Sequence, residues 1–334
     1  MTISPDRPTA APTPVTRLPD FFIAGQPKSG TTALYEMLKR HPQIYMSPVK
    51  EPFYFAADNP LPEGTDGRRW RSLEQTGIRA ESLERYASLF APARPDQKAG
   101  EATTSYLWSR TAARRIAEVN PAARIIAIFR EPAEFLRALH MQLIRNRHED
   151  VLDFRRAVSL DDARREGRHI PDHSVWPMAL IYSDRVRYVE QLLRYEAVFP
   201  REQMLVLIYD DYRSDNEATV RRVLRFLEVD DEVPLEPVEV HKAVRVRSPA
   251  VRAVAQRLTV AEGPVTRAIN STVKAVVPTQ LRRDVRRRLI FGKPKPPDEE
   301  FMRELRVRFR GEVQALGEYL NRDLLSLWGY GDVS

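Results

Sequence analysis

The chain has 334 residues, of which 43% are hydrophobic, so it can bury a sizeable core. It has no cysteine, which excludes disulfides, thiolate zinc sites and a cysteine nucleophile. The net charge of +7 is unevenly placed, because positions 241–296 hold fourteen Lys or Arg against two acidic residues, whereas the rest of the chain is net negative. Such a local excess predicts an anionic partner, which could be a nucleotide, an acidic substrate, a lipid surface or a nucleic acid.

We expect a disordered N-terminal tail at 1–18 and one main domain at 19–334, in which 241–297 is a basic insertion of helix and loop. The tail is rich in Pro, Thr and Ala and lacks the apolar stretch of a signal peptide. No later run approaches the length of a membrane span. These features predict a soluble, cytoplasmic protein.

The first expected element is a strand at 20–25, which leads through a loop into a helix at 31–40. Positions 92–100 are expected to form a loop, and the residues from 101 lead into a helix that runs through 116. The stretch 124–129 has five apolar residues without polar alternation, which predicts a buried strand. Further expected elements are helices at 132–146, 181–199, 218–227 and 301–320 and a second buried strand at 204–209. Strands that alternate with helices predict an α/β fold with a parallel sheet.

The strongest chemical signal is the loop that follows the first strand. It reads Pro27, Lys28, Ser29, Gly30, Thr31, Thr32. Backbone amides, hydroxyls and a lysine at the start of a helix predict a site for phosphate or a similar anion. In a Walker A loop the lysine follows the second glycine, whereas Lys28 precedes Gly30, and the strand at 124–129 ends in Arg130 where a Walker B strand offers a carboxylate. These differences argue against a nucleotide kinase or hydrolase, which we keep as the second functional hypothesis after the one given below.

These residues resemble the P-loop-like sulfotransferase superfamily, whose 5′-phosphosulfate loop reads P-K-[SA]-G-T-T. Positions 50–55 are similar to the segment K-E-P-x-[FY]-F of its carbohydrate and bacterial branches, and positions 100–106 are similar to G-E-x-[TS]-x-x-Y. The family's 3′-phosphate motif is R-[DN]-P with a serine eight residues after the arginine. Positions 130–132 read R-E-P, which is similar to the first part with Glu131 in place of Asp or Asn, and Ala138 stands in place of the serine.

The resemblance covers about 20–232 and 300–330. It implies a three-layer P-loop-like α/β fold, with a central parallel β-sheet flanked by helices, plus helical insertions. It also implies an enzyme that moves a sulfuryl group from 3′-phosphoadenosine-5′-phosphosulfate (PAPS) onto a hydroxyl of a carbohydrate, lipid or small molecule, with PAP as the product. The transfer would be an in-line displacement without a metal, and the six histidines show no convincing ligand spacing.

The resemblance implies a role for each matched residue. Residues 27–32 and Arg130 would hold PAPS, and Lys28 would neutralise the oxygen that leaves the sulfur. Glu51 would be the catalytic base, shielded from water by aromatic neighbours, and His140 is the rival base. The residues expected to contact the acceptor are Lys50, Phe53, Glu101 and Tyr106. The candidates to replace the missing serine are His140, Arg245 and Arg247.

Simpler explanations stand beside these roles. Glu51 could be an exposed loop residue paired with Lys50, and Arg130 could form a surface ion pair with Glu131 or Glu134. The segment 265–291 joins apolar positions to an arginine cluster and could lie peripherally on anionic lipid, although a solvated helix packed on the core is the favoured interpretation. A membrane- or nucleic-acid-binding module built on this basic region is the third hypothesis.

Overall fold

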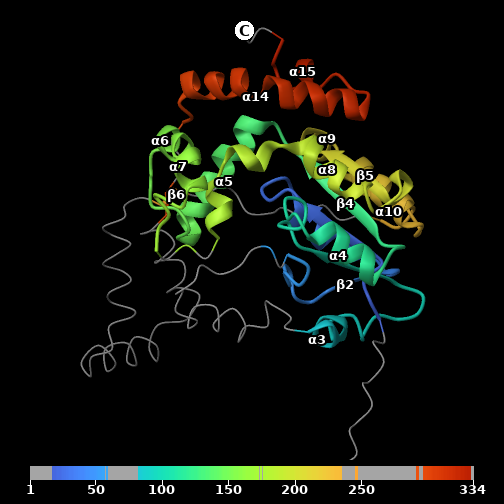
Figure 1. The fold of residues 1–334 in the computed structure, drawn as a ribbon. Coiled ribbons are helices and arrows are strands. Elements are labelled where there is room, and N and C mark those ends of the chain that lie inside the picture. The colour runs from blue at the N-terminus through green and yellow to red at the C-terminus, as the bar shows by residue number, and fades with distance from the viewer. Residues whose placement is uncertain are drawn as a thin grey trace, which may run out of the picture. The chain divides into compact units, whose positions relative to one another are not determined.

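The computed structural model describes residues 17–56, 58, 82–172, 174, 176–234, 245–246, 291–292 and 296–331 (Figure 1). The chain divides into two compact units. The first comprises Met1–Asp58, Asp66–Phe129 and Leu192–Val238, and the second comprises Asn59–Thr65, Arg130–Gln191 and Glu239–Ser334. The expected tail at 1–18 lies almost entirely outside the described residues, and the single domain at 19–334 stays a prediction.

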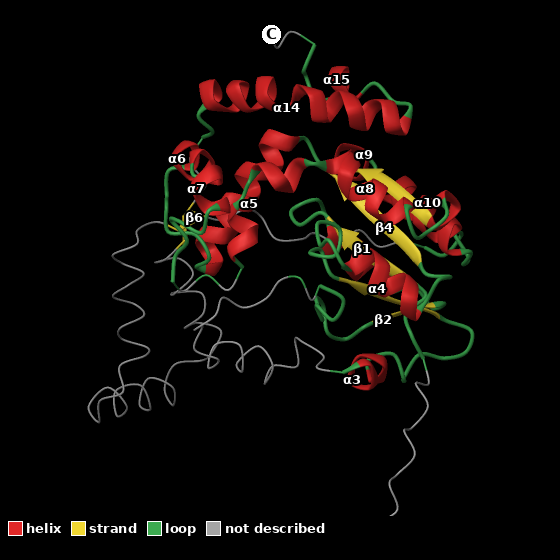
Figure 2. Ribbon diagram, in the orientation of Figure 1, coloured by secondary structure: helices red, strands yellow, loops and turns green. Residues whose placement is uncertain are grey.

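The first unit is built on five parallel strands in the order β2-β3-β1-β4-β5, drawn in yellow in Figure 2. Its elements are β1 (Phe21–Gly25), α1 (Thr31–Leu38), β2 (Ile44–Met46), α3 (Leu83–Ser88), β3 (Lys98–Ala102), α4 (Ala112–Val119), β4 (Arg124–Phe129), η3 (Arg201–Gln203), β5 (Met204–Ile208), α9 (Tyr209–Ser214) and α10 (Asn216–Leu227). Helix α8 (Tyr188–Glu196) begins in one unit and ends in the other. The predicted α/β class with a central parallel sheet is confirmed.

Strand β1 is buried along its whole length because both faces of the sheet are covered. Phe21 and Ile23 join the apolar core that α1 and α10 form on one face. Phe22 points to the opposite face, where its ring lies 5.8 Å from that of Phe55 and 6.2 Å from that of Tyr106. Burial on both faces explains why the sequence shows an unbroken apolar run here.

Strand β3 differs from the prediction, which placed a loop at 92–100 and the start of a helix at 101. Residues Lys98–Ala102 form a strand between β1 and β2, and α4 begins only at Ala112. The sequence K-A-G-E-A has no apolar run, so pairing with neighbouring strands, and not local propensity, makes it extended. A Cβ atom at Gly100 would lie 2.1 Å from the Phe21 ring, so glycine is required at this position.

The second unit is mostly helical. Its elements are α5 (Pro132–Asn146), α6 (Phe154–Ser159), α7 (Asp161–Arg165), η1 (Pro177–Leu180), η2 (Ser183–Val186), β6 (Arg245–Val246), β7 (Phe291–Gly292), α14 (Glu299–Leu320) and α15 (Leu324–Leu327). The predicted helix at 181–199 is wrong at its start, since a short 3-10 helix precedes α8. Helix α14 packs against α5 and α15. None of the helices in the described part of the chain is long and apolar enough to cross a bilayer.

A fully buried ion pair lies within the loops and helices that follow α5. Arg164 Nη2 lies 2.8 Å from Glu149 Oε2, and both side chains are wholly inaccessible to solvent. The Tyr182 hydroxyl donates to the same carboxylate at 3.0 Å, and Arg164 also donates to the carbonyls of Ala157 and Leu180. These added hydrogen bonds are what a buried charge pair needs to offset its loss of hydration.

The substitution Gly100→Ala should destabilise the protein by about 2 kcal/mol, because a methyl group at this position overlaps the Phe21 ring. Urea denaturation measures the change. Gly311→Ala is the matched control, since nothing lies within 4 Å of the added methyl group on α14. That control should be neutral or stabilising by about 0.5 kcal/mol. Equal changes in the free energy of unfolding for the two variants would contradict the close contact between position 100 and the Phe21 ring.

Candidate active site

The loop after β1 is held tightly at the start of α1. The Gln26 amide donates to the Ile128 carbonyl at 2.9 Å, which extends the pairing of β1 with β4. Gly30 precedes the helix with φ of 85°. A Cβ atom at Gly30 would lie 2.7 Å from the Tyr212 ring, so both the conformation and the space require glycine. The turn therefore brings backbone amides to a helix N-terminus, as an anion site requires.

The side chains of this loop differ in accessibility. Lys28 is half-buried and has a left-handed backbone with φ of 63°, which is costly for a residue other than glycine. Thr32 is also half-buried, whereas Thr31 is buried. Ser29 is fully buried, and its hydroxyl faces the Pro27 carbonyl at 3.5 Å. Lys28 and Thr32 are thus the loop side chains that retain access to a ligand without rearrangement.

Glu51 lies at the same edge of the sheet, beyond the end of β2. Its amide donates to the Ala102 carbonyl at 3.0 Å, and its backbone is left-handed with φ of 61°. The Thr104 hydroxyl donates to Oε1 at 3.0 Å, and the Thr104 amide donates to Oε2 at 3.2 Å. Lys50 Nζ lies 3.2 Å from Oε1, which is the ion pair of the simpler explanation. The Glu51 side chain is 24% exposed, so a ligand can reach the carboxylate.

Thr104 binds Glu51 and lies near the end of β1, and sequence reasoning did not identify it. A Cβ atom at Gly25, which ends β1, would lie 3.2 Å from the Thr104 carbonyl oxygen. The Leu107 amide also donates to the Ala24 carbonyl at 2.9 Å. The segment after β3 therefore lies directly against the end of β1. The G-E-x-[TS]-x-x-Y segment contains Thr104, and this was the only signal that could have revealed it.

Glu101 and Tyr106, which were expected to contact the acceptor, lie in the interior. Both are fully buried. The Tyr86 hydroxyl donates to Glu101 Oε1 and the Thr103 hydroxyl donates to Oε2, each at 2.6 Å. Burial raises the pKa of Glu101 to about 7, against the opposing effect of these hydrogen bonds. This environment supports a structural role beneath the site and does not support direct contact with an acceptor.

The aromatic residues that follow Glu51 pack mainly on one another. The Phe55 ring is buried among Phe22, Tyr86 and Tyr106. Tyr54 stacks on Tyr86 at 4.8 Å between centroids. Phe53 is half-buried and has a left-handed backbone with φ of 57°. Phe53 is therefore the ring of this segment that stays a candidate for acceptor contact.

Arg130 immediately follows β4 and belongs to the second unit. Its Nη2 donates to Glu134 Oε2 at 3.1 Å, which matches the simpler expectation of an ion pair. Glu131 does not take part in that pair. It caps α5 by accepting from the amides of Ala133 at 3.1 Å and Glu134 at 2.7 Å. Ala138 is buried on the same helix, and the 3′-phosphate contact of Arg130 stays a prediction.

His140 lies in a packed cluster of the second unit. It is 5% exposed, and its Nε2 donates to the Val151 carbonyl at 2.8 Å. Its ring lies 5.2 Å from that of Phe154, and burial lowers the pKa of the imidazole below its usual value. This is the environment of a packing residue, and it does not support a role as rival base or as substitute for the missing serine.

The other proposed cationic contacts are only partly covered by the structure. The backbone of Arg245 forms β6, but its side chain is not described, and Arg247 lies outside the described residues. Nearly all of 265–291, the segment considered for lipid contact, also lies outside them. In the described ranges, no three His, Asp or Glu side chains gather as a metal site would require. The expectation of a metal-free reaction stays a prediction.

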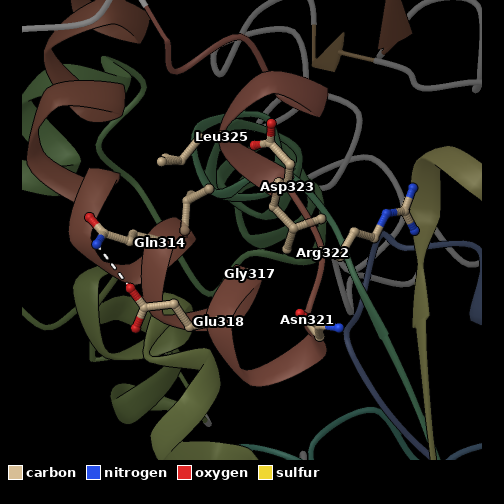
Figure 3. Close-up of a pocket in the computed structure, with 9 residues that line it drawn as sticks. Gln314, Gly317, Glu318, Asn321, Arg322, Asp323 and Leu325 are labelled. Carbon is tan, nitrogen blue, oxygen red and sulfur yellow. Dashed lines mark hydrogen bonds between the residues drawn. The ribbon is translucent and has the colours of Figure 1, made fainter.

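A cavity of about 310 Å³ lies between the last turns of α14 and the start of α15. Figure 3 shows its lining, in which Gln314 Nε2 donates to Glu318 Oε1 at 2.9 Å and which also includes Arg322 and Asp323. Its walls include none of the residues discussed above.

A family model described as "Sulfotransferase family" matches residues 19–233. The chain is 26% identical to carbohydrate sulfotransferase 15 of Mus musculus, over 70% of this chain and 47% of that protein. The human protein of the same name is 27% identical, over 71% of this chain and 47% of that protein. The chain thus spans about half the length of these curated relatives. A sulfotransferase from Alicyclobacillus acidocaldarius superposes with a TM-score of 0.63 at 25% identity, covering 93% of this chain and 99% of that one.

The buried carboxyl of Glu101 should make stability depend on pH. The pKa of Glu101 in the folded protein is raised to about 7, above its value in the unfolded chain. The stabilisation that comes from this difference is fully present at a pH below the pKa in the unfolded chain, and it is lost as the pH rises through about 7. The free energy of unfolding should therefore fall between about pH 5 and about pH 8, by up to about 3 kcal/mol, relative to Glu101→Gln. Urea denaturation at both pH values tests this.

Glu84→Gln is the control for this experiment, because Glu84 is exposed on α3. It should keep the pH dependence of the unsubstituted protein. An unchanged slope in Glu101→Gln would show that the buried carboxyl does not titrate in this range.

Proposed function

The chain belongs to the sulfotransferase family, and we propose that it transfers a sulfuryl group from PAPS onto an acceptor hydroxyl. The observation that carries the proposal is the juxtaposition of two features at one sheet edge. The loop with Lys28 follows β1, and Glu51, which accepts hydrogen bonds from Thr104, follows β2 in the same parallel sheet. Ligands of open α/β sheets bind at the carboxyl ends of the strands, where the direction of winding reverses. Strand β1 lies at that reversal in the order β2-β3-β1-β4-β5.

The residues present fit a phosphosulfate group. The Tyr212 ring occupies the space that a side chain at position 30 would need, so only glycine fits there. The loop amides next to this glycine therefore lie at the N-terminus of α1. PAPS, when bound, supplies a sulfuryl group whose bond to the bridging phosphate oxygen breaks as the acceptor oxygen bonds to sulfur. Lys28 carries the positive charge that would offset the charge developing on the bridging oxygen. Phosphoryl transfer relies on the same combination of positioning and charge.

Glu51 is the proposed general base. Its carboxylate is accessible to a ligand, and the hydroxyl and amide of Thr104 hold it in one orientation. A base must lie within hydrogen-bond reach of the proton it removes, so a fixed carboxylate at the carboxyl edge of the sheet suits an acceptor hydroxyl. Lys50 contacts the same carboxylate and would help to hold it in place.

A carbohydrate hydroxyl is the proposed acceptor. The support is the similarity to carbohydrate sulfotransferase 15, which covers about 70% of this chain and about half of that protein. A lipid or small-molecule hydroxyl is the alternative within the same chemistry. The nucleotide kinase hypothesis loses its support, since the family match covers the loop on which it rested.

Calorimetric titration with PAP tests the donor site. The protein should bind PAP more tightly than 5′-AMP, and Lys28→Ala should weaken PAP binding about 10-fold or more, because it removes a charged contact to the 5′-phosphosulfate site. Arg130→Ala should weaken PAP binding but leave 5′-AMP binding unchanged, because it removes only the 3′-phosphate contact. Tighter binding of Mg-ATP than of PAP would contradict the proposal.

The substitution Glu51→Gln should lower kcat by about 100-fold to 10,000-fold, because the amide cannot accept the acceptor proton. The rate of PAP release from PAPS, measured with a panel of sugar acceptors, gives kcat. Binding of PAP should be unchanged, since Glu51 acts on the acceptor side. Glu118→Gln on the exposed face of α4 is the control and should keep full activity. Full activity in Glu51→Gln would assign the base to another group.

A further inference from the structure

The start of α5 combines the proposed 3′-phosphate ligand with a buried cap. Arg130 is the last residue before the cap, and its guanidinium is held on the first turn of the helix by Glu134. Glu131 is the cap itself, with a side chain that is almost fully buried. The residue that follows Arg130 therefore has a side-chain carboxylate that is fixed by burial and by capping. Whatever fixes Glu131 also fixes the point from which Arg130 extends.

Tyr330 reaches this cap from the end of the chain, 199 residues away. Its hydroxyl donates to Glu131 Oε1 at 2.5 Å. Tyr330 is fully buried, and its amide donates to the Leu325 carbonyl at 2.7 Å, which ties it to α15. Arg306 of α14 faces the same carboxylate at 3.8 Å. The C-terminal elements thus supply a donor and a positive charge to the residue beside Arg130.

A second buried tyrosine acts on Arg130 from the other direction. The Tyr188 hydroxyl, at the start of α8, donates to the Arg130 carbonyl at 2.9 Å. Tyr188 is also fully buried. Two tyrosines on different elements therefore hold consecutive residues. Tyr188 binds the backbone carbonyl of Arg130, and Tyr330 binds the side-chain carboxylate of Glu131. Such double support limits rotation of the backbone at the point where the arginine side chain leaves it.

We propose that Tyr330 is a positioning residue for the 3′-phosphate of the donor, and that it acts through Glu131 on Arg130. This rests on the proposed function, in which Arg130 binds that phosphate. An arginine has a long, flexible side chain, so its phosphate contact is strong only when its backbone is held in place. Ala138 offers no hydroxyl to share the phosphate, so recognition depends more heavily on Arg130.

The test is the affinity ratio of PAP to 5′-AMP, measured by calorimetry on the full chain. Tyr330→Phe removes only the hydroxyl and should lower this ratio about 5-fold, while 5′-AMP binding stays unchanged. Tyr195→Phe is the matched control. Tyr195 is fully buried in the first unit, and its hydroxyl has no hydrogen-bond partner among the residues that the structure describes. The control should keep the ratio.

Glu131→Asp distinguishes this positioning role from simple capping. Aspartate is a good N-cap, but its side chain is one methylene shorter and cannot both cap α5 and reach Tyr330. It should lower the ratio about as much as Tyr330→Phe, and the double variant should show no further loss, because both changes break one contact. Additive losses in the double variant would overturn the coupling.

The outcomes separate the inference from the function on which it rests. If the unsubstituted protein prefers PAP and Arg130→Ala abolishes the preference, the donor site stands. A Tyr330→Phe variant that melts earlier but keeps the full ratio would then show that Tyr330 is only structural, and the inference would be wrong. If the unsubstituted protein shows no preference for PAP, the proposed donor fails and the inference fails with it.

Discussion

Burial of β1 on both faces is the constraint on which the candidate site depends. Phe21 and Ile23 are held by the core on one side, and Phe22 is held by Phe55 and Tyr106 on the other. A strand fixed in this way cannot rotate or slip, so the residues that follow it are delivered to one place. The turn at Gly30 then brings the loop to the start of α1 under the Tyr212 ring. The position of the loop at 27–32 is thus a consequence of how the central strand is packed.

Buried carboxylates connect the candidate site to the rest of the fold. Glu101 accepts from Tyr86 and Thr103 near the end of β3, and Thr104, three residues further on, donates to Glu51. In the second unit, Glu131 caps α5 and accepts from Tyr330. A buried carboxylate with several donors costs much to disturb, because any lost partner leaves a polar group without compensation. Placed next to residues with proposed ligand contacts, such groups hold the backbone of the candidate site in place.

Two residues with proposed chemical roles share an unusual backbone. Lys28 and Glu51 both adopt the left-handed conformation, with φ near 60°. This conformation costs free energy in a residue other than glycine, and it persists only where the surroundings impose it. Nearby, the segment after β3 lies against the end of β1, where a Cβ atom added at Gly25 would lie 3.2 Å from the Thr104 carbonyl oxygen. The strain is therefore located where the proposed reaction needs fixed side chains.

The sequence alone predicts the α/β class, a buried strand at 124–129, a second at 204–209 that ends one residue earlier in the structure, and the helix at 132–146, since each depends on local periodicity or on order along the chain. The tertiary structure alone decided that 98–102 is a strand, because backbone pairing with β1 makes it so. It likewise buried His140 and Glu101, which sequence reasoning had taken for ligand contacts. The contact of Tyr330 with Glu131 joins residues 199 positions apart, and no local pattern encodes such a distance. Side-chain type follows from the sequence, whereas exposure and partners depend on which distant segments the fold brings together.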